Sequence, residues 1–203
     1  GILENTFAAY QRVVGGFLNL SIPQAPLKVF LCGDRPTFER AGLAAGCSPF
    51  PPDVGGVYGK GKILVLGCAT DGVIDEGNYQ HLGVHELVHG LDDQLARFPN
   101  CQDPIWLFEG WAEHWAYSIS GRQVLLGKGV LAARPDTYPK KLEASYAEAS
   151  LPSLLKLDQA AFMSQTGTVY PQSWALVDFL LHGEGGRYAE GFKTYMRLVR
   201  ESP

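Results

Sequence analysis

Five consecutive residues, His85-Glu86-Leu87-Val88-His89, constrain this chain more than any other feature of its sequence. Histidines four positions apart lie on one face of a helix, about 6 Å apart along its axis. Both imidazoles can therefore bind one zinc ion, at nitrogen–metal distances of about 2.1 Å. Glu86 lies one helical step away, where a carboxylate can approach a metal-bound water without binding the metal. The segment predicts a helical zinc site with Glu86 as general base.

Two more polar residues continue this stripe, His81 one turn before His85 and Asp93 one turn after His89. Residues eight positions apart lie about 12 Å apart along a straight helix, so the whole stripe cannot bind one ion. The 81/85 pair has Leu82 where catalysis needs a carboxylate. We therefore interpret His81 as a residue at the rim of the site or behind its ligands, and Asp93 as a solvated charge.

A catalytic zinc ion normally has a third protein ligand and one open position. Glu109, on the next predicted helix and 20 residues after His89, is the best candidate, because the intervening loop lets that helix pack across the first. Glu113 lies one turn further on the same face, where it could accept a hydrogen bond from a ligating histidine. Asp92 is poorly placed to complete a tetrahedron, and His114 lies off that face and is interpreted as an ordinary helix histidine.

Hydrophobic periodicity and turn residues predict an α+β fold with strands early and helices late. The predicted helices cover 1–20, 35–45, 78–96, 104–120, 141–149, 170–182 and 187–200, with a buried strand over 27–31 and a hairpin formed by 57–58 and 63–66. Loops rich in glycine and proline, near 46–56 and 121–139, are expected to shape a cleft. We expect a single domain with an upper lobe over about 1–100 and a helical lower lobe over about 101–203.

Composition excludes several classes of protein. Of the 203 residues, 46% are hydrophobic and 19% charged, which is typical of a packed globular chain. The net charge is −4, and no run of basic residues provides an electrostatic surface for nucleic acid. The apolar stretches are far shorter than the roughly 20 residues that cross a bilayer. Because the chain begins with glycine, we expect that a leader or tag has been removed.

The four cysteines, Cys32, Cys47, Cys68 and Cys101, are too widely spaced for a zinc ribbon. They allow three disulfide pairings, and the alternative is four small buried thiols. An even number of cysteines weakly favours an oxidising compartment. We therefore expect at least one disulfide and a secreted or periplasmic location.

Several segments resemble known zinc peptidases. HELVH followed by WLFEGWAEHW is similar to the gluzincins, which have HExxH and a glutamate ligand on a following helix, and in particular to the M1-like branch (peptidase MA). The ordered series LKVFLCGDRPTFE, GGVYGKGKILVLG, HELVHGL, PIWLFEGWAEHW and YPQSWALVDFLL more closely resembles secreted bacterial proteins of the DUF1570 type. The resemblance runs from about residue 27 to the C-terminus.

The resemblance implies a zincin-like fold, in which the edge strand of a small mixed sheet borders the cleft. It also implies His85, His89 and Glu109 as zinc ligands and Glu86 as the base. Tyr170, at the family's Y-x-Q position, is the candidate donor to the oxyanion; the alternative is a tyrosine packed at a helix start. The G-x-M-E-N strand of the M1 aminopeptidases has no counterpart here, which favours an endopeptidase.

The sequence thus predicts a zinc-dependent peptidase that acts on a peptide or protein. One alternative is a catalytically silent module of zincin fold that binds a partner. Glu86 argues against it, because a purely structural metal site does not need that carboxylate. The other alternative is a zinc hydrolase of a non-peptide amide.

Overall fold

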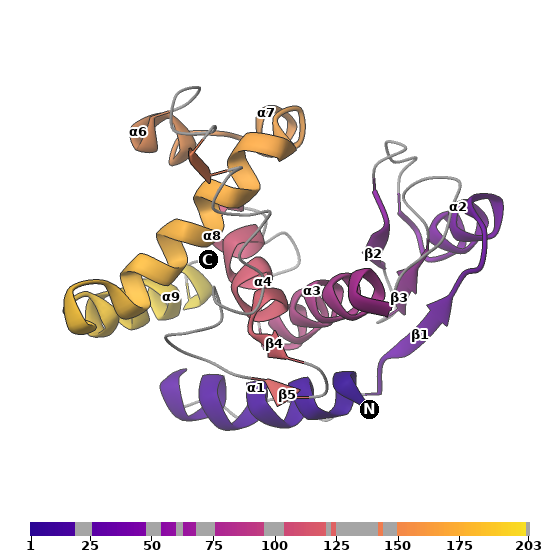
Figure 1. The fold of residues 1–203 in the computed structure, drawn as a ribbon, viewed down its shortest axis with the longest axis horizontal. Helices are drawn as coiled ribbons and strands as arrows, with labels where there is room; N and C mark the ends of the chain where they lie inside the picture. Colours follow the sequence, from indigo (N-terminus) through magenta and orange to yellow (C-terminus); the bar gives the residue numbers. More distant parts are fainter. Residues whose placement is uncertain are drawn as a thin grey trace. The chain divides into compact units, whose positions relative to one another are not determined.

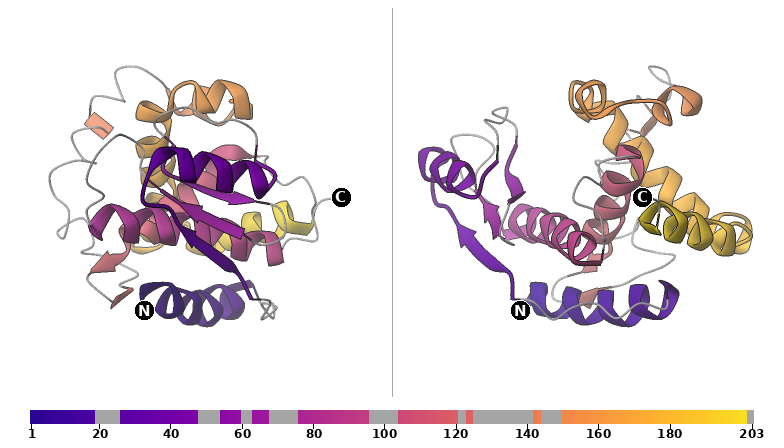
Figure 2. Two further views of the ribbon diagram at one scale, coloured as in Figure 1. Left: turned by 90° about the vertical axis from the view of Figure 1, so that its right-hand side faces the viewer. Right: turned by 180° about the vertical axis from the view of Figure 1, so that it is seen from behind.

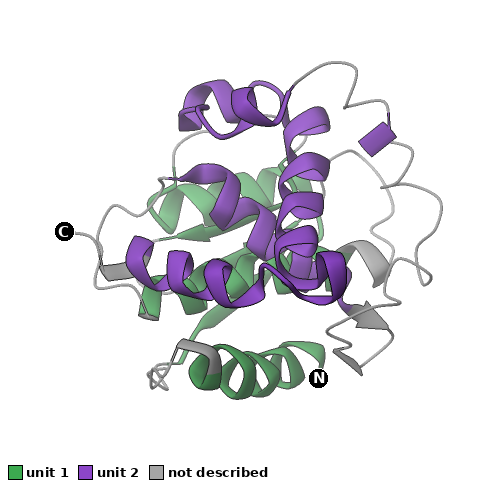
Figure 3. Ribbon diagram, turned by 90° about the vertical axis from the view of Figure 1, so that its left-hand side faces the viewer, with its two compact units in different colours: residues 1–95 green, residues 96–203 purple. Residues whose placement is uncertain are grey.

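The computed structural model describes residues 1–18, 26–47, 54–59, 63–67, 76–95, 104–120, 123–124, 142–143 and 150–201. The chain forms two compact units, Gly1–Leu95 and Ala96–Pro203, which Figure 3 shows in different colours. It is mixed α+β and mostly helical, with a small three-stranded sheet, which confirms the predicted α+β class. The prediction of one zincin-like domain made of two lobes stays a prediction.

The first unit combines three helices with the three-stranded sheet (Figure 1). Its elements are α1 (Ile2–Leu18), β1 (Lys28–Leu31), α2 (Arg35–Ala44), β2 (Gly56–Gly59), β3 (Ile63–Leu66) and α3 (Glu76–Leu95). The strand order is β1-β3-β2, with β1 parallel and β2 antiparallel to β3. The predicted hairpin is therefore confirmed, and the sheet is mixed.

Strand β3 lies between α2 and α3, which Figure 2 shows on opposite sides of the strands. Its side chains alternate as the two-residue period of a strand requires. Val65 joins a core with Cys32 and Phe38 on the α2 side. Leu66 lies on the other side, where it is next to Gly83 of α3. Because both faces are covered, β3 is the buried strand of this unit.

The prediction of a buried strand over 27–31 is wrong as to burial. Strand β1 forms where expected, but all four of its side chains are exposed, and Leu31 is 71% exposed. The physical reason is its place at one edge of the sheet. The helices of the unit make their main contacts with β2 and β3.

Helix α1 packs against α3. Tyr10 is fully buried, and its hydroxyl donates a hydrogen bond to the buried carboxylate of Asp92. On the other side of α3, the Tyr58 hydroxyl of β2 donates to Asp93 at 2.8 Å. Both interactions hold the helix that carries the HELVH segment.

The second unit is built around α4 and α8. Its elements are α4 (Ile105–Tyr117), β4 (Ile119–Ser120), β5 (Gln123–Val124), α6 (Leu151–Leu154), α7 (Gln159–Met163), α8 (Thr166–His182), the 3₁₀ helix η2 (Gly183–Gly185) and α9 (Ala189–Glu201). Almost every side chain of α4 is buried. A Cβ at Gly110 would lie 2.5 Å from the carbonyl oxygen of Ser173, so glycine permits the close approach of α4 to α8.

The first predicted helix of this unit is shorter in the structure than expected. The helix predicted over 104–120 ends at Tyr117, because the Ser118 N–H closes a last turn on the Trp115 carbonyl at 3.0 Å. The following residues form β4, which pairs with β5. Most of the helix predicted over 141–149, and most of the loop predicted over 121–139, lie outside the described residues.

Two earlier expectations concern the chain as a whole. Within the described ranges, no helix has both the length and the apolar character that a bilayer span requires. Cys32 and Cys47 are free thiols. Cys68 and Cys101 lie outside the described residues, so the expected disulfide stays a prediction.

Candidate metal centre

Helix α3 presents His85 and His89 as a preformed pair of donors. Their Nε2 atoms lie 3.0 Å apart, within hydrogen-bond distance of each other, and the ring centroids are 4.7 Å apart at 79°. Two donors bound to one tetrahedral zinc ion at 2.0–2.1 Å lie about 3.3 Å apart. The pair therefore matches two corners of such a site to within a few tenths of an ångström. His85 is buried and His89 half-buried.

Glu86 is buried on the side of α3 that faces β2. A Cβ at Gly56 would lie 2.9 Å from Cγ and 3.1 Å from Oε1 of Glu86, so the strand backbone reaches this carboxylate only because residue 56 is glycine. Burial, and secondarily the negative charge of Glu86, raise the pKa of the Cys47 thiol. Glu86 thus has a fixed place between α3 and an edge strand.

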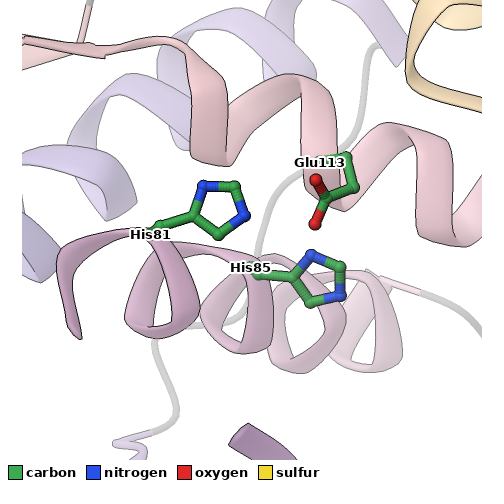
Figure 4. Close-up of side chains that lie close together, drawn as sticks. All are labelled: His81, His85 and Glu113. Atoms are coloured by element: carbon green, nitrogen blue, oxygen red, sulfur yellow. The ribbon is translucent and has the colours of Figure 1, made fainter. Parts of the chain in front are cut away.

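The other polar residues of α3 have separate roles. His81 is half-buried, and its ring is 6.5 Å from that of His85, on the same side of the helix (Figure 4). Asp93 is exposed, as predicted, and accepts the hydrogen bond from Tyr58. Asp92 is turned toward Tyr10.

The remaining predicted site residues belong to the second unit. Glu109 is half-buried in α4. Glu113, one turn later and shown as sticks in Figure 4, is buried. The predicted set of ligands thus draws on two units of the chain. The histidine pair is a feature of the first unit alone, and the addition of Glu109 and Glu113 to it belongs to the proposal below.

Tyr170 does not open its helix as predicted. Helix α8 begins at Thr166 and contains Pro171, so Tyr170 lies in its second turn. The hydroxyl donates to the Sδ atom of Met163 at 3.9 Å, and the ring contacts Phe162 with centroids 5.4 Å apart. These contacts belong to a packed tyrosine, and the role of Tyr170 toward an oxyanion stays a prediction.

Sequence reasoning missed a second group, formed by His114, Asp178 and His182 within the second unit. Burial, and secondarily the charge of His182, lower the pKa of His114 to about 3. The available signal was the four-residue spacing of Asp178 and His182 in a predicted helix. Their proximity to His114 depends on the packing of α4 on α8.

Comparison with family models, curated proteins and solved structures finds no match to this chain. The described residues do contain groups of histidines and carboxylates whose geometry could hold a metal ion. The functional argument therefore depends on these residues and their surroundings.

Proposed function

We propose that this protein is a zinc-dependent peptidase. One observation carries the proposal: the two Nε2 atoms of His85 and His89 lie 3.0 Å apart, with the buried carboxylate of Glu86 beside them. A histidine pair on a helix is common, but a carboxylate buried next to it, against a strand edge, requires a reason. Proton transfer at a metal site provides that reason.

The ligands that we propose are His85, His89 and Glu109, with Glu113 behind them. Two neutral imidazoles and one carboxylate suit zinc and leave a fourth position open. A bound zinc ion would polarise the scissile carbonyl and acidify a water molecule. Glu113 would accept a hydrogen bond from a ligating histidine and so fix its orientation.

Glu86 would act as the general base. It would accept a proton from the attacking water and deliver that proton to the nitrogen of the leaving amine, so that the carboxylate is regenerated in each turnover. Its packing against Gly56 restricts the rotamers that the side chain can adopt. Tyr170 is the proposed donor to the oxyanion, since its hydroxyl is a neutral donor at pH 7.

Strand β2 supports a peptide as the substrate. Among the described strands it pairs with β3 alone, so its other edge has backbone groups that an extended peptide could pair with. The strand also carries Gly56, which places this edge next to Glu86. A peptide added to the edge would lie beside the proposed base, and this favours cleavage within a chain. Separately, the even number of cysteines supports the proposal of a secreted or periplasmic location.

Glu86→Gln is the decisive variant, because the amide keeps the shape of the side chain but cannot accept a proton. We expect the variant to contain about as much zinc as the wild type. We also expect it to cleave no member of an unbiased peptide library, with the products analysed by mass spectrometry. Glu39→Gln, an exposed glutamate in the same unit, is the matched control and should keep full activity. Equal cleavage by the wild type and Glu86→Gln would contradict the mechanism.

Three further measurements test the ligands and the alternatives. Glu109→Ala should lose most bound zinc, and Glu113→Ala should bind zinc about 10–100-fold more weakly. Tyr170→Phe should lower turnover by about 10²–10³-fold with zinc content preserved.

The wild-type protein distinguishes the alternative functions. Wild-type protein that binds zinc but cleaves no peptide would favour the silent binding module. Hydrolysis of small amides without peptide cleavage would favour the non-peptide hydrolase.

A further inference from the structure

Three side chains of the second unit lie close to one another. His114 lies in the last turn of α4, and Asp178 and His182 lie on successive turns of α8. Each offers one donor atom, and these atoms all lie within 4.8 Å of one another. The His114 and His182 ring centroids are 5.7 Å apart.

The spacing of these groups does not correspond to a hydrogen bond. The Nδ1 atom of His114 is 3.7 Å from Oδ1 of Asp178, longer than the roughly 3.2 Å upper limit of a hydrogen bond. It is close to the separation of about 3.3 Å between two donors on one tetrahedral ion. In addition, Nε2 of His182 is buried and has no hydrogen-bond partner within the described part of the chain. A buried polar atom of this kind requires an explanation.

We propose that His114, Asp178 and His182 form a binding site for a divalent transition-metal ion. Two imidazoles and a carboxylate suit zinc, iron or nickel, whereas calcium and magnesium prefer oxygen donors alone. The Asp178 side chain is 36% exposed, which provides an entry route and room for water as a further ligand. This site is independent of the proposed peptidase centre.

Such an ion would join two helices. His114 is held in place by Trp111, whose ring stacks on it at 5.9 Å and 13°. The other two ligands belong to α8, so the ion would link α4 to α8 within one unit. Because it binds only the folded arrangement, the ion stabilises this unit against unfolding.

The experiment isolates this site in the full chain carrying His85→Ala and His89→Ala. After treatment with a chelator, zinc is added and the bound metal is counted by mass spectrometry and titration calorimetry. We expect one zinc per chain, and two per chain in the protein without the histidine changes. Asp178→Asn, which keeps the side-chain shape, and His182→Ala should each weaken zinc binding by at least about 100-fold. Glu190→Gln, an exposed position of the same unit, is the control and should bind as the parent does.

Trp111 provides a second readout, which reports where the metal binds. Cobalt(II) bound at His114 should quench the fluorescence of the stacked indole, and Trp111→Phe should reduce that quenching. Failure of the double histidine variant to bind zinc would overturn this proposal and leave the peptidase proposal untouched. Binding that persists in Asp178→Asn and His182→Ala would overturn it as well.

Discussion

Replacement of Gly110 by alanine tests the packing on which the second unit depends. The added Cβ would lie 2.5 Å from the Ser173 carbonyl oxygen and 2.7 Å from its carbonyl carbon. Carbon atoms normally approach to about 3.5–4.0 Å, so α4 and α8 must separate by roughly 1 Å. The obstacle is backbone, which no rotamer change can move aside. Overpacking of this kind costs about 3 kcal/mol, and the better helix propensity of alanine offsets about 1 kcal/mol. We expect a net loss of about 2 kcal/mol.

Tryptophan fluorescence is a suitable assay, because all four tryptophans, at 106, 111, 115 and 174, belong to the second unit. Urea unfolding followed by fluorescence therefore reports on that unit. With a slope of about 2 kcal/mol per molar urea, the midpoint should fall by about 1 M.

The matched control is Gly191→Ala, in the first turn of α9. No atom lies within 4 Å of a Cβ at that position, so only the change in helix propensity remains. Its midpoint should stay constant or rise slightly. If Gly110→Ala behaved like Gly191→Ala, the close approach of α4 and α8 would not be the structural role of Gly110, and the reasoning would be refuted.

Three further predictions concern single groups. Tyr10→Phe removes a hydrogen-bond donor from the buried carboxylate of Asp92 and should destabilise the first unit by about 1.5–3 kcal/mol. Urea unfolding followed by circular dichroism measures this loss, and an unchanged unfolding midpoint would contradict the prediction. Burial lowers the pKa of His114 to about 3 in the folded chain, against about 6.5 in the unfolded chain. Metal-free protein should therefore be most stable above pH 6.5, and its free energy of unfolding should fall by up to about 1.4 kcal/mol per pH unit between pH 6.5 and 3. A urea midpoint, followed by fluorescence, that stays constant over this range would show His114 to be solvated. Burial also raises the pKa of the Cys32 thiol, so an alkylating reagent at pH 8 should label Cys32 only after the protein unfolds. Rapid labelling of Cys32 in the native protein would contradict its burial.

The sequence predicted the long helices well because their signals are local. The helix expected over 78–96 is observed at Glu76–Leu95, and the four-residue spacing of its histidines places both on one face, where their Nε2 atoms lie 3.0 Å apart. Burial of the strand at 27–31 could not be read in this way. An apolar run has the same composition at the edge of a sheet as in its centre, and the strand order decides which of the two it occupies. The two-residue strand β4 is shorter than any periodic signal.

Metal-binding side chains on different helices could not be grouped from the sequence alone. Asp178 and His182 could be paired from their spacing alone, as His85 and His89 were, but His114 could be joined to them only once α4 was seen to pack on α8. Gly110 lies one turn before His114 on the same face of α4. Because this glycine lets the two helices approach closely, the contact that brings His114 to α8 depends on the absence of a side chain at Gly110. In the segment EGWAEH, the packing of α4 on α8 therefore explains the glycine, independently of the two glutamates on either side of it.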